Sequence, residues 1–189
     1  MNIHFIYCIF VFLLLVPAQL HAVPEPGSVT METLILTSPD FKYGAPIPRR
    51  FTCESRDVSP ALEWEHAPQK TASFALIADD PDASMGTWVH WVIYHIPPHV
   101  HRLEENIPPV EILDEDMKQG VNSLSQIGYH GPCPPSGMHR YYFRIYALDD
   151  PLDTLGPGAT KEQLLSAMEE HILAQGELMG TYQCKADRD

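Results

Sequence analysis

Two stretches that each join a Gly/Pro-rich loop to an aromatic strand pattern place the strongest constraint on the fold of this chain. The first reads DPDASMGTWVHW from Asp80 to Trp91, and the second, about forty residues later, reads GPCPPSGMHRY from Gly131 to Tyr141. Each loop leads to a histidine at the entrance of an aromatic or aliphatic run, where a rigid strand can orient the imidazole while the loop shapes a cavity wall. The pattern therefore predicts a small-ligand pocket built on β-strands.

Most of the chain reads as short strands separated by proline. The 18 prolines cluster in the connections, which argues against a helical bundle. Runs rich in β-branched and aromatic residues predict strands at Leu34–Thr37, Ala72–Ala78, Trp88–Ile96 and Tyr141–Leu148.

The stretch Trp88–Ile96 is apolar on both faces. Alternation places Trp88, His90, Val92 and Tyr94 on one face and Val89, Trp91 and Ile93 on the other. A strand that is apolar on both faces is central in its sheet. We therefore expect His90 to be buried.

One helix is predicted near the C-terminus. Thr160 can cap it, Gln163 completes a capping box, and an apolar stripe follows at Leu164, Leu165, Met168 and Ile172. Gly176 would end this helix, and a short segment, 178–182, would follow it. The stretch 97–126 is Pro-rich and acidic with little periodicity, which indicates a long surface excursion. The fold class is thus mainly β, a β-sandwich with a helix near the C-terminus.

The first 22 residues are typical of a signal peptide. Phe10–Val16 is an unbroken apolar run, too short to span a membrane as a helix, and Ala22 closes a short segment that cleavage could follow. We therefore expect residues 1–22 to be a signal peptide, residues 23–189 to form a single domain with its core at about 31–184, and the chain to be periplasmic or secreted.

The charge of the mature chain argues against polyanionic partners. The net charge is −13, and residues 1–22 contain no Asp, Glu, Lys or Arg. Nucleic acid and anionic membrane surfaces are therefore unfavourable partners.

His90 and His139 are the residues whose chemistry suits the expected pocket. Two histidines that face one cavity can bind a phosphate, a carboxylate or a metal, and Asp80 could orient one ring by accepting its second N–H. Anion binding through protonated histidine should weaken as pH rises past the histidine pKa. Satisfied core histidines are the bland alternative for such a pair.

The flanking residues resemble the phosphatidylethanolamine-binding protein family, in particular its bacterial, Raf-kinase-inhibitor-like branch. The resemblance rests on the two loop–strand motifs and runs from about Phe51 to Tyr182, including the segment Gly180-Thr181-Tyr182. It implies an antiparallel Greek-key β-sandwich. It also implies a pocket for a small anion or phospholipid head group with six ligand-binding residues: Asp80, His90, Pro135, His139, Trp88 and Tyr141.

Three cysteines follow the expected cleavage site: Cys53, Cys133 and Cys184. In an exported protein an odd count suggests one bridge and one remaining thiol. The resemblance places the segments around Cys53 and Cys133 beside the same pocket, which favours a bridge between them. Three idle thiols are the alternative.

With the expected signal peptide, the resemblance implies an exported, non-enzymatic binding protein without a cofactor. Members of the family regulate kinases or inhibit proteases, so a kinase- or protease-inhibitor-like role with an unknown protein partner is one possibility. Two other functions stay open. An enzyme could use Cys133 as a nucleophile or hold zinc or iron between Asp80, Asp82, His90 and His139. An interaction module could instead retain the pocket only as a vestige. The His-x-His pair at 99 and 101 reads as an exposed loop, and Ser136 lacks the context of a hydrolase nucleophile.

Overall fold

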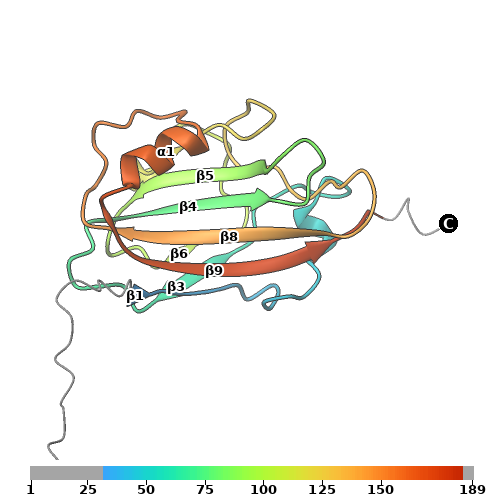
Figure 1. Ribbon diagram of the computed structural model, residues 1–189, viewed down its shortest axis with the longest axis horizontal. Coiled ribbons are helices and arrows are strands. Elements are labelled where there is room, and N and C mark those ends of the chain that lie inside the picture. Colours follow the sequence, from blue (N-terminus) through green and yellow to red (C-terminus); the bar gives the residue numbers. More distant parts are fainter. Residues whose placement is uncertain (1–31, 185–189) are drawn as a thin grey trace, which may run out of the picture. The chain divides into compact units, whose positions relative to one another are not determined.

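The computed structural model describes residues 32–184, which form two β-sheets and one α-helix (Figure 1). The expected signal peptide lies outside the described residues. The strands are β1 (Glu32–Thr33), β2 (Ile35–Thr37), β3 (Leu62–Glu65), β4 (Ser73–Asp80), β5 (Trp88–Ile96), β6 (Arg102–Leu103), β7 (Lys118–Gln119), β8 (His139–Leu148) and β9 (Ile172–Tyr182). Two 3₁₀ turns, η1 (Arg49–Phe51) and η2 (Asp114–Asp116), and the helix α1 (Lys161–Met168) complete the elements.

The larger sheet has the order β1-β9-β8-β4-β5-β7, and the smaller has the order β2-β3-β6. All pairs of named strands are antiparallel except β1 with β9, which is parallel. The four long strands β5, β4, β8 and β9 lie side by side in Figure 1. The mainly β class and the C-terminal helix are confirmed, whereas the Greek-key connectivity stays a prediction.

Two apolar clusters cover the two faces of the larger sheet. One contains residues of both sheets, including Trp64 of β3 and Trp91 of β5. The other lies on the face that carries α1 and includes Val92, Leu164 and Met168. Because both faces of β4 and β5 are covered, nearly every residue of these strands is buried.

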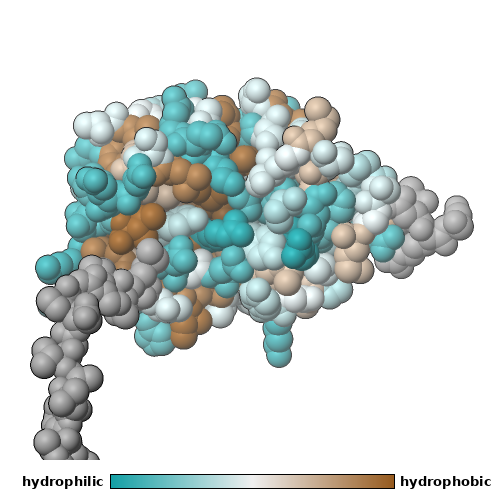
Figure 2. Space-filling model, viewed as in Figure 1, coloured by the Kyte–Doolittle hydropathy of each residue, from teal (hydrophilic) through white to brown (hydrophobic). Residues whose placement is uncertain are grey.

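A buried carboxylate fixes α1 to this second face. Asp79 is 3% exposed and pairs with Arg144 of β8 at 2.7 Å and with Lys161 at the start of α1. Figure 2, drawn from the same side as Figure 1, shows hydrophobic residues gathered mainly in the half of the view that contains α1, with hydrophilic residues among them.

The predicted faces of β5 are wrong at Val89 and His90 because the strand bulges there. Val89 pairs with Asp79 and Trp91 pairs with Ala78, which leaves His90 as an extra residue. A bulge reverses the alternation, so Val89 joins the cluster of Val92 on the helix face. His90 is buried as expected, but its ring packs edge-on against Tyr141, in the cluster between the sheets.

The predicted helix is confirmed at its start and wrong at its end. Thr160 and Gln163 form the expected capping box, and Leu164 and Met168 are buried. The helix ends at Met168, however, and Ile172 opens β9, a strand of 11 residues. Ten register pairs with β8 stabilise residues 172–182 as a strand, including the predicted helix end at Gly176.

The stretch 97–126 lacks long elements, but it is not wholly a surface excursion. Gln119 in β7 is fully buried and pairs with Ile93 of β5, so this stretch closes one edge of the larger sheet. The Gln119 amide donates to the Pro108 and Val110 carbonyls, and its oxygen accepts from the Trp91 indole at 2.8 Å. These bonds satisfy a buried amide and fix the course of the loop.

The outer edge of β9 is paired with two earlier segments of the chain. Glu32 and Thr33 pair with residues 174 and 175. Farther along, the Ile47 N–H donates to the Thr181 carbonyl at 2.8 Å, and the Thr181 N–H donates to the Ala45 carbonyl at 3.0 Å. No helix among residues 32–184 has the length and apolar character to span a membrane.

Candidate functional site

The two loop–strand motifs meet at a pocket of about 210 Å³. The β4–β5 loop supplies one wall and the loop before β8 supplies the other. All six residues expected from the sequence line this pocket. Its full lining is Asp80, Ala83, Ser84, Met85, Trp88, His90, His130, Cys133, Pro134, Pro135, His139 and Tyr141.

Asp80 and His139 form a pair at the pocket wall. His139 Nδ1 lies 2.7 Å from Asp80 Oδ2, and Asp80 is only 3% exposed. Because a carboxylate only accepts, Nδ1 carries the hydrogen, and Nε2 is the ring nitrogen that remains for a ligand. Asp80 thus orients His139, which is the role that its residue type suggested.

Asp80 also organises the turn after β4. Its Oδ1 accepts from the Asp82 backbone N–H at 2.8 Å. Asp82 does not cap this turn, because its carboxylate instead accepts from the side chain and backbone N–H of Arg140. Hydrogen bonding to Arg140 lowers the pKa of Asp82 to about 2. The two aspartates thereby join the β4–β5 loop to the start of β8.

His90 differs from His139 in its burial and in its partner. Its Nδ1 lies 2.6 Å from the His130 backbone carbonyl, so this nitrogen donates. Burial lowers the pKa of His90 to about 4, which leaves the ring neutral near neutral pH. Nε2 then carries a lone pair and can accept a hydrogen bond from a protonated ligand atom.

A second carboxylate–histidine pair, which the sequence analysis missed, also borders the pocket. His130 Nδ1 lies 2.9 Å from Asp57 Oδ2, and the Gly131 N–H donates to Asp57 Oδ1 at 2.6 Å. Burial of Asp57 acts in the opposite direction, but these hydrogen bonds lower its pKa. The rings of His130 and His90 stack at 6.3 Å. His130 could have been predicted because it directly precedes the GPCPPSG motif. Asp57, 73 residues earlier, lies in a segment with no pattern that indicates a site.

The rest of the wall is largely apolar. Trp88 at the start of β5 and Pro135 in the loop before β8 both line the pocket, and Tyr141 of β8 is 2% exposed. The Tyr141 hydroxyl has no hydrogen-bond partner among residues 32–184. Burial raises the pKa of Tyr141, and the nearby Asp80 carboxylate acts in the same direction. A buried, unpaired hydroxyl at a pocket wall is a group that a ligand or water would satisfy.

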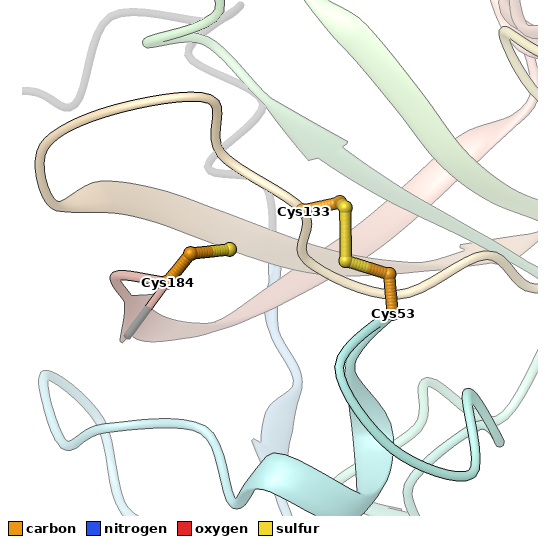
Figure 3. Close-up of side chains that lie close together, drawn as sticks. All are labelled: Cys53, Cys133 and Cys184. Atoms are coloured by element: carbon orange, nitrogen blue, oxygen red, sulfur yellow. A yellow bond between two sulfur atoms is a disulfide. The ribbon is translucent and has the colours of Figure 1, made fainter. Parts of the chain in front are cut away.

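A disulfide joins Cys53 to Cys133 at the pocket rim (Figure 3). Cys133 lines the pocket, and Cys53 follows the η1 turn. The bridge therefore ties one pocket loop to a segment that is 80 residues earlier in sequence. The Cys53 N–H also donates to the Pro132 carbonyl at 3.2 Å, and Tyr129 donates to the Phe51 carbonyl at 2.8 Å.

The metal set considered from the sequence does not gather around one point. Among residues 32–184, the group of metal-type ligand atoms that lie within 4.8 Å of one another consists of the Cys53, Cys133 and Cys184 sulfurs. The carboxylate oxygens of Asp80 and Asp82 are instead committed to hydrogen bonds. His99, of the His-x-His pair, lies on the surface and pairs with Glu115 at 2.6 Å.

Fold and site together define a two-sheet β protein with a histidine-lined pocket between two loops. Residues 37–183 of this chain match the phosphatidylethanolamine-binding protein family. The match covers most of the chain, and the chain belongs to this family.

Relatives and solved structures agree with that assignment. A UPF0098 protein of Methanothermobacter thermautotrophicus is 52% identical over 136 residues, covering 72% of this chain and 89% of the relative. A phosphatidylethanolamine-binding protein homologue from Chlamydia trachomatis superimposes with a TM-score of 0.75 at 42% identity, covering 82% of this chain and 99% of that structure. E. coli YbcL, described as a member of the mammalian family, gives a TM-score of 0.75 at 28% identity, with coverage of 80% and 99%.

Proposed function

We propose that this protein binds a small anionic group, such as a phosphate, a phospholipid head group or a carboxylate, in the pocket between the two loops. The observation that carries the proposal is the geometry of three imidazoles. In His90, His130 and His139, Nδ1 is held by a carbonyl or carboxylate, so Nε2 is the nitrogen available to a ligand.

His139 and His90 offer different chemistry to a ligand. A protonated His139 would donate from Nε2 to an anion while its Nδ1–H stays paired with Asp80. Neutral His90 accepts, so it favours a ligand that still carries an O–H, such as a monoprotonated phosphate. Together the two rings favour a small ligand group that carries both an acceptor for His139 and a donor for His90. It also provides local attraction, which is required because the net charge of −13 repels anions.

The test is calorimetric titration with inorganic phosphate, phosphoethanolamine and acetate. The variant His139→Gln should bind about tenfold more weakly or worse, because one charge-assisted hydrogen bond contributes about 1.5–3 kcal/mol. Binding to the unmodified chain should be stronger at about pH 5.5 than at about pH 8.5, since protonated histidine is the donor.

His171→Gln is the matched control. His171 also donates from Nδ1 to a carboxylate, that of Asp149, at 2.9 Å, but it lies outside the pocket. The His171→Gln variant should bind all three anions with the affinity of the unmodified chain. Equal affinities for the His139 and His171 variants would refute the proposed site, and absence of binding by the unmodified chain would support the interaction-module alternative.

We further propose that the protein is exported and acts by binding rather than by catalysis. The Cys53–Cys133 disulfide supports export, because such bonds persist mainly in oxidising compartments. It also argues against Cys133 as a nucleophile, since a bridged sulfur is not a thiolate. Sequencing the N-terminus of the protein secreted on expression tests the export, with a mature chain expected to begin near residue 23 and an unprocessed chain contradicting it.

A kinase- or protease-inhibitor-like role stays a prediction from the resemblance to the family. Phosphatase and esterase assays on the purified chain test the enzyme alternative. Turnover abolished by Cys133→Ala would overturn the non-enzymatic proposal.

A further inference from the structure

The third cysteine lies against the disulfide at the pocket rim. The Sγ atoms of Cys53, Cys133 and Cys184 all lie within 4.8 Å of one another, although they come from three segments of the chain. Figure 3 shows the Cys184 side chain directed toward the bridge. A thiol this close to a disulfide needs only side-chain and small loop movements to reach either sulfur.

Hydrogen bonds hold the three segments together without the disulfide. The segment of Cys53 is bonded to the loop of Cys133 through the Pro132 carbonyl and through the pairing of Asp57 with His130. The end of β9 is bonded to the start of β8, where Tyr182 pairs with His139, and the Tyr182 hydroxyl donates to Glu54. The three sulfurs should therefore stay close together while the bond between any two of them changes.

Solvent and reagents can reach the cluster. Cys133 is exposed, and Cys53 and Cys184 are partly exposed. Exchange requires a thiolate that can approach a disulfide sulfur, so exposure and proximity are its two structural requirements.

We propose that these residues form a thiol–disulfide exchange site, in which Cys184 moves the bridge at the pocket rim. The Cys184 thiolate attacks Cys133 Sγ, an S–S bond forms between Cys184 and Cys133, and the bond from Cys133 to Cys53 breaks. Cys53 leaves as a thiolate and takes up the proton that Cys184 released. Attack at Cys53 Sγ instead releases Cys133. Nothing is oxidised or reduced overall, so no external electron acceptor or donor takes part.

The exchange would change what holds the pocket loop. In the structure the loop of Cys133 is tied to the segment after η1. After attack at Cys133, it is tied to the end of β9, beside Tyr182. After attack at Cys53, the loop loses its covalent tie, and a thiol appears in the pocket lining. This inference goes beyond the proposed anion binding and does not depend on it.

Disulfide mapping of the full chain tests the proposal. All proteins carry Cys8→Ser, so that the three cysteines in question remain. The folded, oxidised chain is incubated at mildly alkaline pH, quenched in acid, alkylated under denaturing conditions and mapped by mass spectrometry. We expect the alkyl label on Cys53 or Cys133 as well as on Cys184, together with disulfide-linked peptides that contain Cys184. A label confined to Cys184 at every incubation time would overturn the proposal.

Two variants test the same geometry independently. Cys53→Ser leaves Cys133 and Cys184, and we expect one oxidised glutathione to join them within one chain and to leave as two reduced glutathiones, with loss of both titratable thiols and no glutathione bound to the protein. Cys184→Ser is the matched control, whose bridge should map only to Cys53 and Cys133. A Cys53→Ser chain that keeps its native circular dichroism spectrum yet retains two thiols would refute the proposal. If that variant does not fold, the mapping of the folded chain decides alone.

Discussion

The buried His90 should make the fold lose stability between neutral and mildly acidic pH. Burial lowers its pKa from 6.5 to about 4 in the folded chain, whereas the unfolded chain has the ordinary value. Between these two pKa values the unfolded state binds a proton that the folded state does not, so the free energy of unfolding rises with pH across this window.

The size of the effect follows from the shift. One pKa unit corresponds to about 1.4 kcal/mol, so the shift of His90 corresponds to about 3 kcal/mol lost between about pH 7 and pH 4. The lowered pKa values of Asp57 and Asp82 add a loss of stability of the same sign, which begins about one pH unit above their ordinary value of 3.8 and continues toward the folded values. Most of this loss lies below about pH 4, and the part within the window is common to the unmodified chain and the His90 variant.

Urea unfolding from about pH 7 to about pH 4, in buffers without phosphate or carboxylate, measures this dependence. His90→Gln should flatten the pH profile by about 3 kcal/mol, since a glutamine amide does not take up the proton. Only the change with pH is compared, because Gln also alters the packing against Tyr141.

His99→Gln is the control. Its side chain is 70% exposed, and its pairing with Glu115 is a surface ion pair, so its profile should parallel that of the unmodified chain. If the His90→Gln profile also parallels the unmodified chain, the neutral, buried state assigned to His90 is refuted.

Three further perturbations test the pocket loops by the same unfolding assay. Asp80→Asn should cost about 1–3 kcal/mol, because one of the two N–H donors at Asp80 loses its acceptor; Asp149→Asn, at an exposed aspartate–histidine pair, should cost far less, and similar costs would contradict the argument. Gly131→Ala should cost about 2 kcal/mol or more, since a Cβ there would lie 2.0 Å from the Phe51 carbonyl oxygen. Gly156→Ala, with nothing within 4 Å of the added Cβ, should stay close to the unmodified chain, and a tolerated Gly131→Ala would show that the loop can move away. Reduction of the bridge in Cys184→Ser should cost about 4 kcal/mol, given the 80-residue separation of Cys53 and Cys133; a cost below about 1 kcal/mol would show that the unfolded chain gains little freedom.

Local sequence patterns predicted those elements whose own residues indicate burial or the start of a helix. The apolar run at Trp88–Ile96 gave the bounds of β5, and Thr160 with Gln163 gave the start of α1. The end of α1 could not be predicted in the same way. Ile172 continues a helical spacing by coincidence, and only pairing with β8 makes 172–182 a strand.

The residues of the site likewise divide into those that a local motif predicted and those that only tertiary contacts reveal. Asp80, His90, Trp88, Pro135, His139 and Tyr141 fall within the two motifs, and the structure brings all of them to one pocket. Asp57 was missed because its contact with His130 joins residues that are 73 apart, in a segment without a motif of its own. The bulge at His90 arises from strand register, which depends on the partner strand and is not encoded in the alternation of β5 alone.

The pairing along the outer edge of β9 has a consequence for how copies of this protein meet. A strand of 11 residues at the edge of a sheet would present a row of unpaired amides, which is a template for intermolecular association. Here residues 32–34 pair with one end of that edge and residues 44–47 with the other. Between them lies Glu177, whose carboxylate pairs with Arg144, so the open part of the edge carries charge. The two segments thus protect the edge of β9 against pairing with a strand of another molecule, and their removal should make the protein more prone to aggregation.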